Sequence, residues 1–155
     1  MEETTITIQH PLRNEASEFS TMRGGHVALR AADYAGIVKW YQEKLDFRII
    51  QEWPLGDLQQ AFLAPPNDDN FCVEILGGGQ PLPQPDYTDL NESLQPAGYH
   101  HFCLEVLNID QTVAELRRRG VNVLGEPFDF PTISKRMAFF ADPYGNLIEL
   151  ASRLK

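Results

Sequence analysis

The feature that most constrains this chain is an internal repeat, in which one order of residues occurs twice, 75 positions apart. The run His26-Val-Ala-Leu-Arg-Ala has its counterpart in His101-Phe-Cys-Leu-Glu-Val, and both runs alternate between two faces as β-strands do. Glu74 follows His26 by 48 residues, and Glu149 follows His101 by the same interval. A chain that repeats such a unit is expected to fold as two similar modules.

The residue pattern of each copy predicts a leading strand, one helix and three further strands. Asp33 and Asn108 each stand seven residues after the leading histidine, and their side chains are suited to cap the start of a helix. The apolar spacing that follows is helical, and Gly120 suits the end of the second helix. Each copy therefore has the order β-α-β-β-β, and the chain belongs to the α+β class. The expected helices span 34–45 and 109–119, and the later strands span 47–53, 61–64, 71–76, 121–124, 137–141 and 147–151.

The repeat divides the chain into four segments. Residues 1–22 are polar and terminal, so we expect a mobile N-terminal leader. The first module is expected over 23–76 and the second over 99–155, together forming one domain. Residues 77–98 are rich in Gly, Pro and Gln and predict a linker, long enough to suggest a functional role.

Composition excludes several classes of partner. Thirteen Lys and Arg against 22 Asp and Glu give a net charge of −9, which repels nucleic acid. No apolar run is long enough to span a membrane, so no membrane partner is expected. Cys72 and Cys103 are too few for a disulfide framework, and the N-terminal stretch lacks the apolar centre of a signal peptide. We therefore expect a cytoplasmic protein with free thiols.

Strand alternation places two histidines and two glutamates on the sheet faces opposite the helices. These are His26, Glu74, His101 and Glu149, and two imidazoles with two carboxylates suit a divalent cation. The alternative is a solvated sheet face with ordinary polar residues, but the matched His-to-Glu spacings favour the metal. His100 competes for one position, and the 75-residue offset favours His101. We expect the two modules to form a curved mixed sheet around a metal cleft, with the helices outside.

The paired modules resemble the vicinal oxygen chelate superfamily, which includes glyoxalase I, extradiol dioxygenases, methylmalonyl-CoA epimerase and the bleomycin- and fosfomycin-resistance proteins. The turn Asp-Pro-x-Gly-Asn before a strand with a late Glu is a specific marker of that superfamily. The resemblance covers residues from about 24 to 152. The stretches that carry it are GGHVALRAADYAGIVKWYQEKLDF, FCVEIL, GYHHFCLEV and FFADPYGNLIELAS.

The resemblance is strongest to glyoxalase I (lactoylglutathione lyase)-like members, because they use a His-Glu-His-Glu ligand set. It implies that His26, Glu74, His101 and Glu149 bind one divalent metal ion per site, with Ni, Co, Zn, Mn and Fe(II) all open. It also implies a lyase or isomerase with a small-molecule substrate, a 2-oxoaldehyde–thiol adduct. In this scheme the metal chelates two neighbouring oxygens while a carboxylate moves the proton, with Glu149 as first candidate and Glu74 as second.

Two arginines are candidates for substrate binding. Arg30 matches a glyoxalase I position that meets the glutathione part of the substrate, and its alternative is a salt bridge with Glu105. Arg136, next to Lys135, could contact an anionic substrate group, and its alternative is an ordinary surface basic pair. The resemblance further implies a homodimer. An extradiol dioxygenase, an epimerase and a non-catalytic drug- or metabolite-binding resistance protein remain alternative functions.

Overall fold

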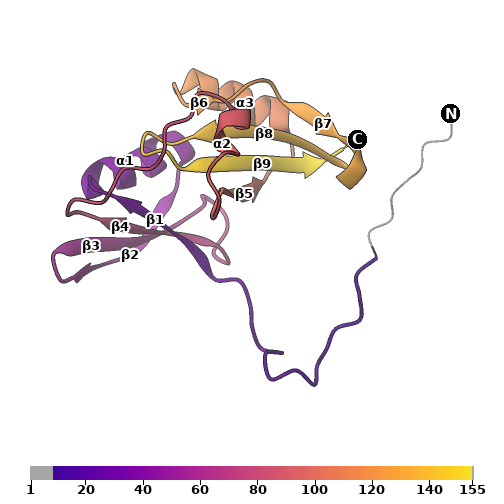
Figure 1. Ribbon diagram of the computed structural model, residues 1–155, viewed down its shortest axis with the longest axis horizontal. Helices are drawn as coiled ribbons and strands as arrows, with labels where there is room; N and C mark the ends of the chain where they lie inside the picture. The colour runs from indigo at the N-terminus through magenta and orange to yellow at the C-terminus, as the bar shows by residue number, and fades with distance from the viewer. Residues whose placement is uncertain (1–8, 155) are drawn as a thin grey trace.

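The first module is a four-stranded mixed sheet that carries one long helix (Figure 1). The computed structural model describes residues 9–154. In this sheet the strand order is β1-β4-β3-β2, with β1 parallel to β4 and the other neighbours antiparallel. The elements of this module are β1 (His26–Ala31), α1 (Tyr34–Leu45), β2 (Arg48–Leu55), β3 (Leu58–Ala64) and β4 (Cys72–Gly77).

The second module repeats this arrangement. Its strand order is β5-β9-β8-β6, with β5 parallel to β9, and β7 adds a short pairing to β8. A four-residue helix, α2 (Leu90–Ser93), lies in the segment between the modules. The elements of this module are β5 (His101–Glu105), α3 (Ile109–Arg118), β6 (Asn122–Val123), β7 (Phe128–Phe130), a 3-10 turn (Pro131–Ile133), β8 (Lys135–Ala141) and β9 (Leu147–Arg153).

Both long helices begin at the expected capping residues. The Asp33 carboxylate accepts a hydrogen bond from the backbone N–H of Gly36 at 2.9 Å. The Asn108 side-chain oxygen accepts from the backbone N–H of Gln111 at 3.0 Å. Each contact satisfies one of the amides that a helix leaves free at its N-terminus. The predicted starts of α1 and α3 are therefore confirmed.

The two modules share one hydrophobic core. Buried side chains of α1 and α3, such as Ile37 and Val113, join one cluster with buried side chains of both sheets. Phe71 of the first module lies against Phe102 of the second, with ring centroids 6.0 Å apart. The modules therefore bury part of their surface against each other, and their organisation as one domain stays a prediction.

The α+β class and the paired β-α-β-β-β modules are confirmed, and the strands form two mixed sheets, one in each module. Some boundaries differ from the prediction. The strand expected over 121–124 contains only two residues, because the Val121 amide donates to the Leu116 carbonyl at 2.9 Å and completes the end of α3. The short elements α2 and β7 were not expected, since segments of three or four residues carry no readable periodicity.

The N-terminal segment lies apart from the two sheets. Residues 1–8 of the expected leader lie outside the described residues. Residues 9–25 are exposed almost throughout, and Figure 1 shows them running away from the body of the molecule before β1 begins. In the described part of the chain, no helix has the length and apolar character needed to cross a membrane.

Candidate metal site

Each module presents one histidine–glutamate pair on the corresponding face of its sheet. His26 Nε2 lies 3.0 Å from Glu74 Oε2, and His101 Nε2 lies 3.1 Å from Glu149 Oε2. The same strand register produces both pairs, because each glutamate stands two residues beyond the position opposite its histidine. We call His26 and Glu74 the first half-site, and His101 and Glu149 the second half-site.

A phenylalanine lies beside each pair at an equivalent position. Phe62 is opposite Glu74 in the β3–β4 ladder, and its ring centroid is 5.3 Å from that of His26. Phe139 is opposite Glu149 in the β8–β9 ladder, at 5.4 Å from His101. The 75-residue offset does not reveal these residues, because the turn before the final strand is two residues longer in the first module and shifts Phe62 relative to Phe139.

The two half-sites belong to separate sheets. Across residues 9–154, no group of three or more His, Cys, Asp or Glu side chains comes together in a way that could hold a metal ion. The strands that carry the two histidines, β1 and β5, both lie at the edge of their sheet. The structure thus brings together His26 with Glu74 and His101 with Glu149, and a single four-ligand cleft stays a prediction.

The donor chemistry of the half-sites fits a divalent cation. Both glutamate side chains are largely buried, with 15% of Glu74 and 13% of Glu149 exposed. Among the described residues, each has its histidine as its one salt-bridge partner, and a histidine carries charge only when protonated. Burying carboxylates without a cation is costly, and one divalent ion would neutralise two of them. Each half-site supplies one nitrogen and one oxygen, a mixed set that such ions accept.

Cys103 lies beside the second half-site and remains a thiol. It stands opposite Glu149 in the β5–β9 ladder. Burial, and then the hydrogen bond and negative charge of Glu149, raise the pKa of the Cys103 thiol to about 12. A thiol with such a pKa is a poor nucleophile near neutral pH. The chemistry of this face therefore belongs to the histidine and the carboxylate.

Arg30 is engaged with backbone carbonyls in this structure. Its guanidinium donates to the carbonyl oxygens of Ala31 at 2.8 Å, Leu76 at 2.7 Å and Gly78 at 2.5 Å. The alternative salt bridge with Glu105 does not form, because Glu105 pairs with Lys135 at 2.9 Å. Arg30 thus ties together the ends of β1 and β4, and its contact with a substrate stays a prediction.

Arg136 lies between two carboxylates. Its guanidinium nitrogens are 2.8 Å from Asp110 Oδ1 and 2.6 Å from Asp129 Oδ1. Both hydrogen bonds raise the pKa of Arg136, so its charge is permanent but already balanced. A role for Arg136 in binding an anionic substrate group also stays a prediction.

His100 is a neighbour of the second half-site rather than part of it. Its Nδ1 lies 2.7 Å from Nδ1 of His101, and its Nε2 lies 3.0 Å from the Ser93 hydroxyl. His101 therefore contacts His100 with one ring nitrogen and Glu149 with the other. The two adjacent histidines, expected to compete for one position, instead contact each other.

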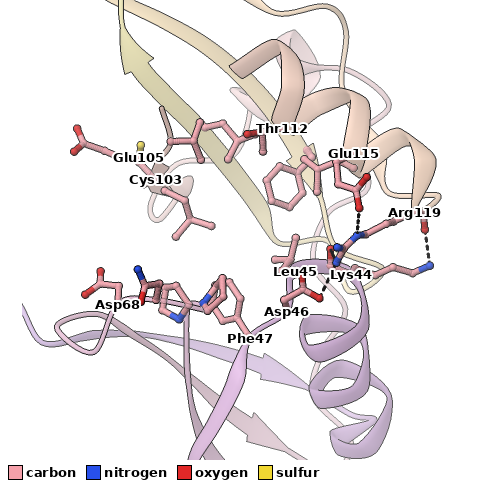
Figure 2. Close-up of a pocket in the computed structure, with 18 of the residues that line it drawn as sticks. Lys44, Leu45, Asp46, Phe47, Asp68, Cys103, Glu105, Thr112, Glu115 and Arg119 are labelled. Atoms are coloured by element: carbon pink, nitrogen blue, oxygen red, sulfur yellow. Dashed lines mark hydrogen bonds and ion pairs between the residues drawn. The ribbon is translucent and has the colours of Figure 1, made fainter. Parts of the chain in front are cut away.

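A groove of about 770 Å³ lies between the modules, beside β5 (Figure 2). Figure 2 shows Arg119, Asp46 and Glu115 converging at one end and Cys103 with Glu105 at the other. Arg119 Nη1 is 2.9 Å from Asp46 Oδ1, and its Nε is 2.7 Å from Glu115 Oε1. Arg119 thus links Asp46 at the end of α1 to Glu115 of α3 and joins the modules at this end of the groove.

Comparison with known proteins identifies the family. Residues 23–150 match the model of the Glyoxalase/Bleomycin resistance protein/Dioxygenase superfamily, and the chain belongs to this superfamily. Glyoxalase I of Saccharomyces cerevisiae is 27% identical over 168 residues, which cover 95% of this chain and 50% of the yeast protein. The chain thus spans about half the length of that relative.

Two further comparisons concern an epimerase sequence and a solved structure of the same fold. Mitochondrial methylmalonyl-CoA epimerase of Mus musculus is 23% identical over 159 residues, covering 96% of this chain and 86% of the mouse protein. The fold is also shared with the fosfomycin resistance protein FosX of Listeria monocytogenes, solved in complex with Mn(II) and sulfate. FosX has a TM-score of 0.56 and 17% identity, with 84% of this chain and 91% of FosX covered.

Proposed function

We propose that the protein is a metal-dependent lyase or isomerase of the glyoxalase I type that acts on a 2-oxoaldehyde–thiol adduct. The observation that carries this proposal is the matched geometry of the half-sites, with Nε2–Oε2 distances of 3.0 and 3.1 Å. The similarity to yeast glyoxalase I supports the choice of reaction. The substrate class is part of the proposal.

A homodimer would complete the site. Because β1 and β5 lie at sheet edges, a two-fold contact can set β1 of one chain beside β5 of its partner. The first half-site of each chain would then face the second half-site of the other. The dimer would contain two equivalent sites, each with two imidazoles and two carboxylates.

His26, Glu74, His101 and Glu149 would hold the metal ion. When bound, a divalent metal supplies positive charge that polarises two neighbouring substrate oxygens. The chain's own part is to bind that ion and to move one proton. The two phenylalanines beside the half-sites, Phe62 and Phe139, would exclude water from the reacting atoms.

The proton is moved by a carboxylate, which we assign to Glu149, with Glu74 as the second candidate. In the adduct, the carbon that carries the hydroxyl and the sulfur loses a proton to the carboxylate. The neighbouring carbon, initially a ketone, receives it. The hydroxyl hydrogen passes from the first oxygen to the former ketone oxygen, and the product is a 2-hydroxyacyl thioester. The reaction is an internal rearrangement, so the atoms balance without any co-reactant.

Metal analysis and turnover assays test this proposal. Protein purified without chelators or affinity metals should contain one divalent ion per chain and should run as a dimer in light scattering. After metal loading, it should convert the adduct of methylglyoxal with glutathione or another thiol. Failure with every thiol adduct would refute the substrate class, and failure to bind any divalent ion would refute the metal site.

An epimerase is the second candidate, because the match to the mouse epimerase covers 86% of that protein. An epimerase also moves a proton at a carbon next to a carbonyl, and the same carboxylates can serve. Exchange of substrate hydrogen with deuterated water separates the two reactions. An epimerase would exchange the α-hydrogen of a 2-methyl-branched acyl thioester, whereas the glyoxalase reaction requires a 2-oxoaldehyde adduct.

A further inference from the structure

Four groups form a continuous hydrogen-bonded chain that ends at the second half-site. The Ser93 hydroxyl lies 2.7 Å from the Leu90 carbonyl and 3.0 Å from His100 Nε2. His100 Nδ1 lies 2.7 Å from His101 Nδ1, and His101 Nε2 lies 3.1 Å from Glu149 Oε2. This series of hydrogen bonds therefore connects the linker between the modules to His101, a candidate metal ligand.

The chemistry of each group fixes the direction of these hydrogen bonds. A carbonyl oxygen only accepts, so the single Ser93 hydroxyl hydrogen points to Leu90. The Ser93 oxygen must then accept, and His100 donates to it from Nε2. A neutral imidazole has one N–H, so His100 Nδ1 is an acceptor. It receives the Nδ1–H of His101, which leaves His101 Nε2 without a proton and with its lone pair directed toward the half-site.

We infer that His100 and Ser93 are positioning residues that hold the His101 ring with its proton on Nδ1 and its Nε2 available to a metal ion. Hydrogen bonds to the second nitrogen of a ligating histidine fix its ring and tautomer, and loss of such a partner typically lowers metal affinity by about 10- to 100-fold. The role toward a metal rests on the proposed function, whereas the hydrogen-bonded chain exists in the metal-free protein.

Packing of the linker holds Ser93 in place. Tyr87 and Leu90 of the linker pack against Met137, Phe139 and Leu147 on the second sheet. Figure 1 shows α2 lying against β8 and β9, and only 6% of Ser93 is exposed. The linker thus has an anchored position at the second half-site, and this accounts for its length.

The chain of hydrogen bonds distinguishes the two half-sites. The residue before His101 is His100, whereas the residue before His26 is Gly25, which has no side chain. The repeat therefore supplies His101 with a partner at a position where the first module supplies none. We expect the second half-site to be the more strictly oriented donor pair.

Ring-nitrogen NMR and metal affinity test this inference. In ¹⁵N spectra of the metal-free and zinc-loaded protein, His100 should carry its proton on Nε2, and in the zinc-loaded protein His101 should carry its proton on Nδ1. His100→Leu removes the acceptor and should weaken zinc binding about 10- to 100-fold in competition with a chromophoric chelator. His100→Asn places an oxygen near the former Nδ1 and should restore most of the affinity.

Controls separate positioning from folding. Leu94→Ala alters an exposed side chain next to Ser93 and should leave zinc affinity and the histidine spectra unchanged. Ser93→Ala removes the acceptor for His100 Nε2, so His100 should no longer be held in one tautomer. The circular dichroism spectrum should be unchanged. A wild-type His100 with its proton on Nδ1, or wild-type zinc affinity in His100→Leu, would overturn the inference. If the protein binds no zinc, the metal-free spectra still decide whether the hydrogen-bonded chain exists, and the proposed function fails separately.

Discussion

Tyr41 and Asp142 join the two modules through a buried hydrogen bond, in which the Tyr41 hydroxyl donates to Asp142 Oδ2 at 3.1 Å. Tyr41 lies on α1 and Asp142 lies in the turn before β9, so the bond spans the interface between the modules. The same carboxylate accepts from the side chain of Asn146 at 2.7 Å and from two backbone amides. The Tyr41 hydroxyl thus couples the hydrogen-bonded turn before β9 to the helix of the other module.

Tyr41→Phe should destabilise the protein by about 1–2 kcal/mol, because it removes a buried hydrogen bond to a carboxyl group and leaves the ring packing intact. Urea unfolding measures the change. Tyr144→Phe is the matched control, since its hydroxyl makes a long contact of 3.4 Å with the exposed Asp33 and should cost well under 1 kcal/mol. Equal effects of the two substitutions would contradict a special role for the Tyr41 bond.

The Asp142 carboxyl predicts a specific dependence of stability on pH. Burial raises the pKa of Asp142 above its usual value of 3.8, and its hydrogen bonds only partly offset this. Because the pKa of Asp142 is raised in the folded state, its contribution to the free energy of unfolding is fully present below pH 3.8. That contribution is lost as the pH rises through the folded pKa. The stability of the wild type relative to Asp142→Asn should therefore fall as the pH rises from about 3.8. A relative stability that increases over this range would contradict a raised pKa of Asp142 in the folded protein.

The sequence predicted the parts of the fold that depend on local patterns. The caps Asp33 and Asn108 determine where the helices begin, and alternation determines that each histidine shares a face with its glutamate. It did not predict contacts that depend on distant packing. Ser93 meets His100 only because the linker folds back onto the second sheet, and Arg30 meets the Gly78 carbonyl only because β1 lies beside β4.

Glu149→Gln should preserve the shape of the second half-site and remove the charged base. Turnover of the thiol adduct should fall by about two to four orders of magnitude, which is typical for loss of a general base, while metal content falls much less. Parallel assays of turnover and bound metal measure the difference. Glu74→Gln is the matched variant in the first module. A larger loss of turnover in Glu74→Gln would show that Glu74, rather than Glu149, moves the proton.

His101→Ala and His100→Ala should separate the ligand from its neighbour. His101→Ala removes a donor nitrogen and should lower the amount of metal bound even at saturating metal. His100→Ala should reach nearly full occupancy at saturation, with an affinity lowered by about 10- to 100-fold. Titration followed by elemental analysis distinguishes the two effects. Loss of stoichiometry in His100→Ala with retention in His101→Ala would show that the roles of the adjacent histidines are reversed.

Complementation between two inactive variants tests the central claim, that the half-sites of two chains combine into one metal site. His26→Ala and His101→Ala homodimers should each bind little metal, because every site lacks one nitrogen. A mixed dimer would contain one doubly altered site and one intact site. After mixing and exchange of subunits, metal binding should rise to about a quarter of the wild-type amount, since half of the dimers are mixed and each has one of two sites intact. Exchange of subunits without any recovery of metal binding would contradict the account.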